Sequence, residues 1–217
     1  MDQMYTELMH QAREMESRAW IQTYAGKYNA AHALFMRAHG LWVRVANFTG
    51  LVRAIRVDVA IAKTLQWQGE FGAAQQILER ALLTAHDGEI DSVLDLILVS
   101  LADIALDAQD YSFARKLLEE TLPRSVRDPI FVAGQLELLA LAYFGEDDPI
   151  RAVTLFSSAR AAQDKISVGR TIPVLVIRRQ QFQTAAQQLI GKTEYEKRWN
   201  QGERMTLTDT LSYALSC

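Results

Sequence analysis

The sequence has little of what marks a secreted, membrane-spanning or disulfide-stabilised protein. Its 217 residues include one cysteine, Cys217, which excludes an intrachain disulfide and favours a cytoplasmic location. No apolar run reaches the ~20 residues that a membrane span needs. The first ten residues lack the basic flank and apolar core of a signal peptide. A net charge of −3 gives no general attraction to nucleic acid or to an anionic membrane.

Proline and glycine are also scarce, with four and eleven residues respectively. Ala, Leu, Gln and Arg are plentiful, and this composition favours helix throughout the chain. The hydrophobic fraction of 49% is that of an ordinary globular protein. We therefore expect an all-α fold.

Motifs that carry chemistry are absent. The sequence has no GxxxxGK[ST] phosphate loop, no GxSxG nucleophile elbow and no helix-turn-helix with a basic recognition helix. We therefore expect no enzyme, no cofactor and no direct binding of nucleic acid. The segments 177–181 (IRRQQ) and 196–204 (EKRWNQGER) are modestly basic, but acidic neighbours balance them, so we expect solvated faces there.

Internal similarity is the most informative feature. Four stretches begin with a turn and then place small and large apolar residues at fixed offsets: AGKYNAAHALFMRAH from Ala25, QGEFGAAQQILERAL from Gln68, AQDYSFARKLLEETL from Ala108 and GEDDPIRAVTLFSSAR from Gly145. In each stretch an alanine stands three residues after the residue that follows the turn, which is an aromatic residue in three stretches and Pro149 in the fourth. A large apolar pair follows three and four residues after that alanine. These alanines are Ala31, Ala74, Ala114 and Ala152.

This spacing predicts a helical hairpin as the repeated unit. An alanine lets the second helix approach the helix before it, and the large pair lies on the same helical face and fills the groove. Ala74 and Ala114 are therefore expected to be buried at helix crossings. Because one hairpin cannot bury its apolar face alone, we predict a right-handed solenoid of about four hairpins. We expect a single domain over residues 1–217, with hairpins in 1–165 and a helical cap in 166–217.

Helix start and stop residues agree with this plan. Asp128 and Asp148 each precede a proline. Aspartate is favoured as an N-cap residue and proline at the first helical position, so each pair predicts the start of a helix. Thr193 is expected to cap a short helix that runs to about Trp199 and is stopped near Gly202. Thr206 begins a variant of the capping box, with an aspartate three residues later.

The hairpin pattern resembles tetratricopeptide repeats (TPRs), which carry small residues and a turn Gly-aromatic pair at these offsets. The alanines recur here every 38 to 43 residues, against the usual ~34, and extra helical turns would absorb the difference. The first repeat fits worst, because Arg18 and Gln22 stand where its first helix should be apolar. A neighbouring stripe predicts that this helix is rotated as an N-terminal cap: Met4, Leu8, Ala12, Met15 and Ala19.

The C-terminal segment carries a second resemblance. It is similar to the segment that closes the helical-repeat region of MalT/AfsR/LuxR-type bacterial ATPase transcriptional regulators, through residues Ile190-Gly191, Tyr195, Trp199, Gly202, Met205, Leu207, Ala214 and Leu215. These matches are structural rather than catalytic. Trp199 is expected to pack under the last helix, Gly202 to form a left-handed cap, and Met205 and Leu207 to staple the turn.

Together the resemblances imply a non-enzymatic interaction or effector-sensing domain of a bacterial signalling or transcriptional regulator. A free-standing TPR-like adaptor is the alternative, because the sequence holds no ATPase motif. A small all-α metal protein is a third, weaker alternative that rests on the ExxH pattern of Glu7 and His10. A di-iron bundle needs a second such pair and further inward carboxylates. His32 and His39, seven residues apart, lack a ligand set around them.

A recognition surface is expected on the first helices of the hairpins, on the side that TPR arrays turn toward their groove. Aromatic and cationic side chains at such positions favour a protein or peptide partner, or a small effector. The alternative is that the tryptophans pack between hairpins. The candidate residues are Arg13, Glu16, Trp20, Tyr24, Arg56, Lys63, Gln66, Trp67 and Asp103, with Leu106 beside the last.

Overall fold

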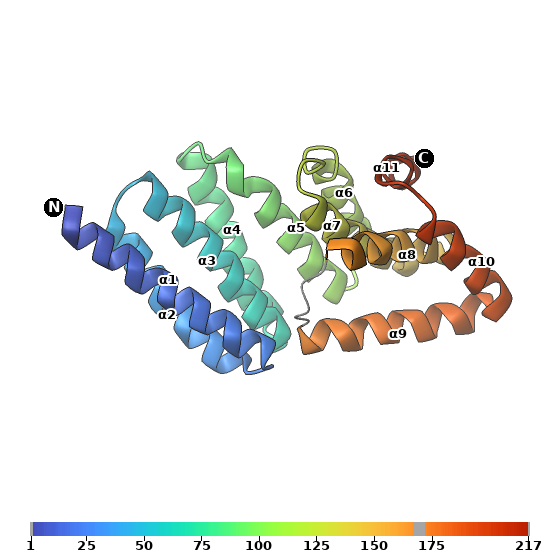
Figure 1. Cartoon of the computed structure of the whole chain (residues 1–217), viewed down its shortest axis with the longest axis horizontal. Coiled ribbons are helices and arrows are strands. Elements are labelled where there is room, and N and C mark those ends of the chain that lie inside the picture. The colour runs from blue at the N-terminus through green and yellow to red at the C-terminus, as the bar shows by residue number, and fades with distance from the viewer. Residues whose placement is uncertain (1, 167–171, 217) are drawn as a thin grey trace. The chain divides into compact units, whose positions relative to one another are not determined.

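The computed structural model describes residues 2–166 and 172–216, and Figure 1 shows that its regular elements are all helices. The prediction of an all-α helical repeat is confirmed. In order along the chain the helices are α1 (Asp2–Tyr24), α2 (Tyr28–Val45), α3 (Phe48–Trp67), α4 (Phe71–Asp87), α5 (Asp91–Asp107), α6 (Tyr111–Thr121), α7 (Pro129–Gly145), α8 (Pro149–Ile166), α9 (Pro173–Ile190), α10 (Lys192–Glu203) and α11 (Leu207–Leu215).

The first eight helices pair into four hairpins, and all four hairpins have the same type of turn. Each turn has three residues, and its middle residue has a left-handed backbone: Gly26, Gly69, Gln109 and Asp147, with φ between 62° and 83°. The residue after it donates its N–H to a carbonyl five residues earlier, as Asp110 does to Ala105 at 2.9 Å. This bond satisfies a carbonyl that the helix end would otherwise leave unpaired. The identical turns mean that the four hairpins align without a gap.

The chain divides into two compact units. Unit 1 comprises Met1–Ser100 with Arg170–Leu175, and unit 2 comprises Leu101–Gly169 with Val176–Cys217. Cys217 itself lies outside the described residues. The expected single domain over 1–217 stays a prediction.

The core of unit 1 forms where alanines meet large side chains. Ala74 is fully buried in α4, as predicted, and so is Ala31 in α2. Helix α2 packs against both α1 and α3, with Phe35 and Trp42 buried on its inner face. The apolar stripe of α1 is also buried from Leu8 to Ala19, whereas Met4 is exposed.

The core of unit 2 is built around α7 and α8. Ala114 is fully buried in α6, as predicted. Helix α7 buries nine of its 17 residues and packs against α6 and α8. It begins at the predicted N-cap, Asp128, whose carboxylate accepts the N–H groups of Ile130 and Phe131 at 3.1 Å. Helices α10 and α11 both contact α8.

Two predictions about the C-terminal helices are wrong. Gly202 lies inside α10 and is not left-handed; the left-handed glycine here is Gly191, which separates α9 from α10. Thr193 does not cap α10, because the helix begins one residue earlier and its N-cap is Gly191. The capping box of Thr206 and Asp209 is confirmed, with both of its hydrogen bonds formed.

The ring of Trp199 lies against α8. Its centroid is 6.1 Å from that of Phe156 and 5.7 Å from that of Tyr195, which stacks on it. The Trp199 carbonyl accepts the hydroxyl of Ser157 at 2.5 Å. These contacts make Trp199 a link between α10 and α8.

Candidate functional site

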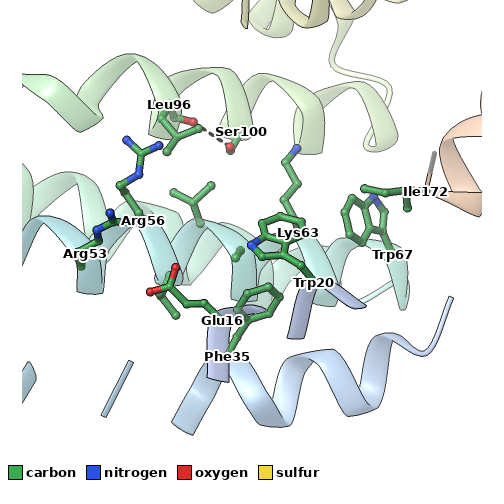
Figure 2. Close-up of a pocket in the computed structure, with 13 residues that line it drawn as sticks. Glu16, Trp20, Phe35, Arg53, Arg56, Lys63, Trp67, Leu96, Ser100 and Ile172 are labelled. Atoms are coloured by element: carbon green, nitrogen blue, oxygen red, sulfur yellow. Dashed lines mark hydrogen bonds between the residues drawn. The ribbon is translucent and has the colours of Figure 1, made fainter. Parts of the chain in front are cut away.

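Unit 1 contains a pocket of about 430 Å³, a volume within the usual range for ligand sites. Helices α1, α2, α3 and α5 contribute side chains to it, as Figure 2 shows. Its lining residues are Glu16, Trp20, Phe35, Arg53, Arg56, Val57, Val59, Ala60, Lys63, Trp67, Leu96, Ser100 and Ile172.

Aromatic rings form the apolar part of the pocket. Trp20 lies edge-on to the buried Phe35, with 5.2 Å between ring centroids, and 37% of Trp20 stays exposed. Trp67 is half-buried and contacts Tyr28 of the preceding hairpin at 5.4 Å. Trp67 therefore lines the pocket and also packs between two hairpins.

Cations form the polar part of the pocket. Arg53, Arg56 and Lys63 extend from α3, whereas Glu16 is the one carboxylate among the lining residues. The Glu16 carboxylate accepts the indole N–H of the buried Trp42, which lies under Arg53. Three of the lining side chains are therefore cationic and one is anionic.

The structure brings together five of the residues expected at the groove: Glu16, Trp20, Arg56, Lys63 and Trp67 all line the pocket. Their role in binding stays a prediction.

The other residues expected at the groove do not line the pocket. Arg13 is exposed elsewhere on α1, and Tyr24 contacts Trp20 at 6.3 Å between centroids. Gln66 is buried and accepts a bond from Lys63 at 3.3 Å. Asp103 and Leu106 are buried and belong to unit 2.

Sequence reasoning missed Arg53. The helical spacing could have identified it, because Arg53, Arg56, Ala60, Lys63 and Trp67 recur every three or four residues and so share one face of α3. The residues from α5 and Ile172 could not have been found in this way, because their sequence carries no local mark of the pocket.

In unit 2, two arginines of α9 form ion pairs with the first helices of the third and fourth hairpins. Arg178 Nη1 lies 2.6 Å from Asp103 Oδ1, and Arg178 Nη2 lies 3.7 Å from Asp107 Oδ1. Arg179 donates two bonds of 2.7 Å to the carboxylate of Glu137. Burial alone would lower the pKa of Arg178, but the two aspartates outweigh it and raise that pKa. The expected solvated face at 177–181 is therefore wrong for these two arginines, which are only about one-fifth exposed.

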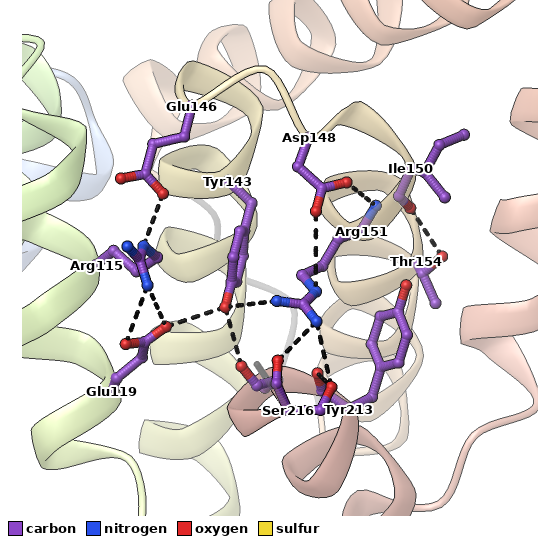
Figure 3. Close-up of polar contacts among 11 residues, drawn as sticks. Arg115, Glu119, Tyr143, Glu146, Asp148, Ile150, Arg151, Thr154, Tyr213 and Ser216 are labelled. Atoms are coloured by element: carbon purple, nitrogen blue, oxygen red, sulfur yellow. Dashed lines mark hydrogen bonds and ion pairs between the residues drawn. The ribbon is translucent and has the colours of Figure 1, made fainter.

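A second network joins α7 and α8 to the end of α11 (Figure 3). Arg151 donates to the carbonyl of Ser216 at 2.7 Å and to the hydroxyl of Tyr143 at 3.1 Å. The Tyr143 hydroxyl also lies 3.0 Å from Glu119 and 3.1 Å from the Ala214 carbonyl. Burial raises the pKa of Tyr143, and the hydrogen bond to Glu119 raises it further. The network ties the end of α11 to α7 and α8.

Residues of the metal-site alternatives make ordinary structural contacts. Glu7 accepts a bond from Gln11 at 2.7 Å. The ring of His32 bonds to Thr64 at 3.2 Å, and that of His39 to Asp58 at 3.2 Å. Within residues 2–166 and 172–216, no group of three or more His, Cys, Asp or Glu side chains could hold a metal ion.

Among solved structures, the chain is similar to nearly identical TPR-like repeats from Podosopora anserina, assigned as a kinesin light chain. The TM-score is 0.57 at 18% sequence identity, over 88% of this chain and 92% of that one. The fold is TPR-like. At this identity the likeness establishes the fold alone. No family model matches the sequence, and no curated protein shows significant similarity to it. None of the described helices combines the length and apolar character of a membrane span.

Proposed function

We propose that the chain is a non-enzymatic protein-interaction domain whose unit 1 pocket binds an acidic segment of a partner that carries a bulky apolar side chain. The observation that carries this proposal is the pocket itself. Aromatic rings from α1 and α3 form a wall that suits an apolar group, and three cations with one opposing carboxylate suit acidic neighbours. TPR-like repeats typically bind proteins rather than catalyse reactions.

The proposal includes a cytoplasmic location, no cofactor and no direct contact with nucleic acid. The C-terminal resemblance to bacterial regulators supports a narrower version, in which the partner is another domain of a transcriptional regulator. A free-standing adaptor fits the fold equally well. The neighbouring coding sequence separates these two, since a phosphate loop or a helix-turn-helix beside this chain favours the regulator.

Selection from a phage-displayed library of random peptides on the purified protein tests the pocket. We expect recovered peptides to combine Asp or Glu with Trp, Phe or Leu. A synthetic peptide of the recovered sequence should bind Lys63→Glu and Arg56→Glu about tenfold more weakly, a loss of about 1.4 kcal/mol. Added salt should weaken binding to the unchanged protein, because the attraction is screened.

Arg44→Glu is the matched control, because Arg44 is an exposed cation of α2 that does not line the pocket. It changes the net charge by the same amount and should leave binding unchanged. Recovery of basic or uncharged peptides, or equal losses in all three variants, would contradict the proposal. Trp67→Ala is a poorer test, since Trp67 also packs on Tyr28 and its loss would lower stability.

A further inference from the structure

Asp103, which binds α9, stands at a repeat position that lines the pocket in unit 1. Asp103 precedes Ala114 by eleven residues, as Lys63 precedes Ala74. The turns between the helices have the same length and backbone, so this alignment needs no gap. Lys63 lines the open pocket of unit 1, whereas only 5% of Asp103 is exposed beside Arg178.

Glu137, the other acidic residue that binds α9 closely, obeys the same relation. It precedes Ala152 by fifteen residues, as Glu16 precedes Ala31. Glu16 lines the pocket of unit 1, whereas Glu137 is 8% exposed and accepts both bonds of the Arg179 guanidinium. The third and fourth hairpins thus present to α9 the repeat positions that line the pocket in unit 1.

Ion pairs and a small apolar contact together attach α9. Of its 18 residues, Phe182 and Ala186 are the buried ones, whereas α7 buries nine of 17. The ring of Phe182 contacts those of Phe144 and Phe156, with centroids 5.2 and 4.4 Å away. Elsewhere α9 exposes apolar side chains, with Ile177 at 54%. One buried aromatic residue and two ion-paired arginines therefore hold α9, and charge-assisted bonds of this kind also recur where separate chains recognise one another.

We propose that α9 is a resident ligand of a second recognition face, formed in unit 2 by Asp103, Asp107 and Glu137, and that a basic helix of a partner protein displaces it. The partner helix carries two adjacent arginines followed three residues later by an aromatic residue, as Arg178, Arg179 and Phe182 do in α9. This face selects a basic partner, and its test is independent of the unit 1 pocket.

A synthetic peptide with the sequence of residues 172–191 is the probe for this face. The full chain carrying Arg178→Gln and Arg179→Gln should bind it at least about tenfold more tightly than the unchanged chain, because the resident helix no longer competes for the site. Adding Asp103→Asn and Glu137→Gln to that chain should abolish the binding. A control peptide with both arginines replaced by glutamine should bind neither chain.

Hydrogen exchange on the unchanged chain gives a second readout that needs no substitution. Raising the salt concentration from about 0.05 M to about 1 M screens the ion pairs, so amides of α9 should exchange faster while those of α7 keep their protection. Equal peptide binding by the unchanged and Gln-substituted chains, or absence of binding by both, would overturn the proposal. If the substituted chain loses helicity, the exchange result decides, and salt-independent protection of α9 overturns the proposal.

Discussion

Gly202 of α10 and the carbonyl oxygen of Thr154 in α8 are so close that a Cβ atom on residue 202 would lie under 3.0 Å from that oxygen. Real Cβ atoms do not approach other atoms this closely. We therefore expect Gly202→Ala to push α10 away from α8 and lower the free energy of unfolding by about 1–3 kcal/mol. Thermal denaturation followed by circular dichroism measures the change.

Gly134→Ala is the control for Gly202→Ala. Gly134 lies inside α7, and nothing stands within 4 Å of a Cβ built there. Alanine should raise the stability by about 0.5–1 kcal/mol, because it loses less conformational freedom in a helix. A similar loss in both variants would show that the contact with Thr154 is not the cause.

The shared left-handed turn gives a second prediction. Gln109 holds φ at 63°, a conformation that costs a residue with a side chain more than it costs glycine. Gln109→Gly should therefore raise the free energy of unfolding by about 0.5–1 kcal/mol in a denaturant titration. Gly69→Ala, at a φ of 83° in the equivalent turn, should change it in the opposite direction. Changes of the same sign would contradict the strain argument.

The pair of His39 and Asp58 gives a pH dependence. The hydrogen bond to Asp58 raises the pKa of His39 above 6.5, although burial and Arg80 oppose the shift. A raised pKa in the folded state adds stability that is complete below the unfolded pKa and is lost as pH rises through the folded pKa. The melting temperature should thus fall more between about pH 6 and about pH 8 in the unchanged protein than in His39→Asn. If the melting temperatures of the two proteins change in parallel with pH, the pair of His39 and Asp58 does not cause the pH dependence.

Ala114 tests the repeat pattern itself. Because it is fully buried in α6, Ala114→Leu should overpack the core of unit 2 and cost about 1–3 kcal/mol. Lys116→Leu is the control, since Lys116 is exposed on the same helix and its substitution should stay within about 0.5 kcal/mol. The difference in melting temperature between the two variants is the measurement.

The sequence predicted the hairpins because their determinants are local. Ala31, Ala74 and Ala114 stand at fixed distances from their turns, and both sides of each helix pair are close in the chain. The prediction of a solvated face for the arginines of α9 is wrong for the opposite reason. Arg178 has acidic neighbours in space, Asp103 and Asp107, that its local sequence does not show.

Gly202 shows another limit of local reasoning. Near the end of a helix, glycine usually provides a left-handed residue, and this preference predicts a left-handed cap at Gly202. The structure uses the glycine for close approach to Thr154 instead, and only the packing of α10 on α8 reveals that. For the candidate site, the repeat alignment pointed to Lys63 and Trp67, which line the pocket, whereas the contribution of α5 depends on tertiary structure.

The ion pairs of α9 also set an order of folding. Within a hairpin, contacts form across a turn of three residues, whereas Arg178 and Asp103 are separated by 75 residues. Contacts between distant residues form after local ones, because closing a long loop costs more entropy. On the ribosome, α5 and α7 are made before α9. We therefore expect the acidic face to be open to solvent during synthesis and α9 to dock on it as a late step.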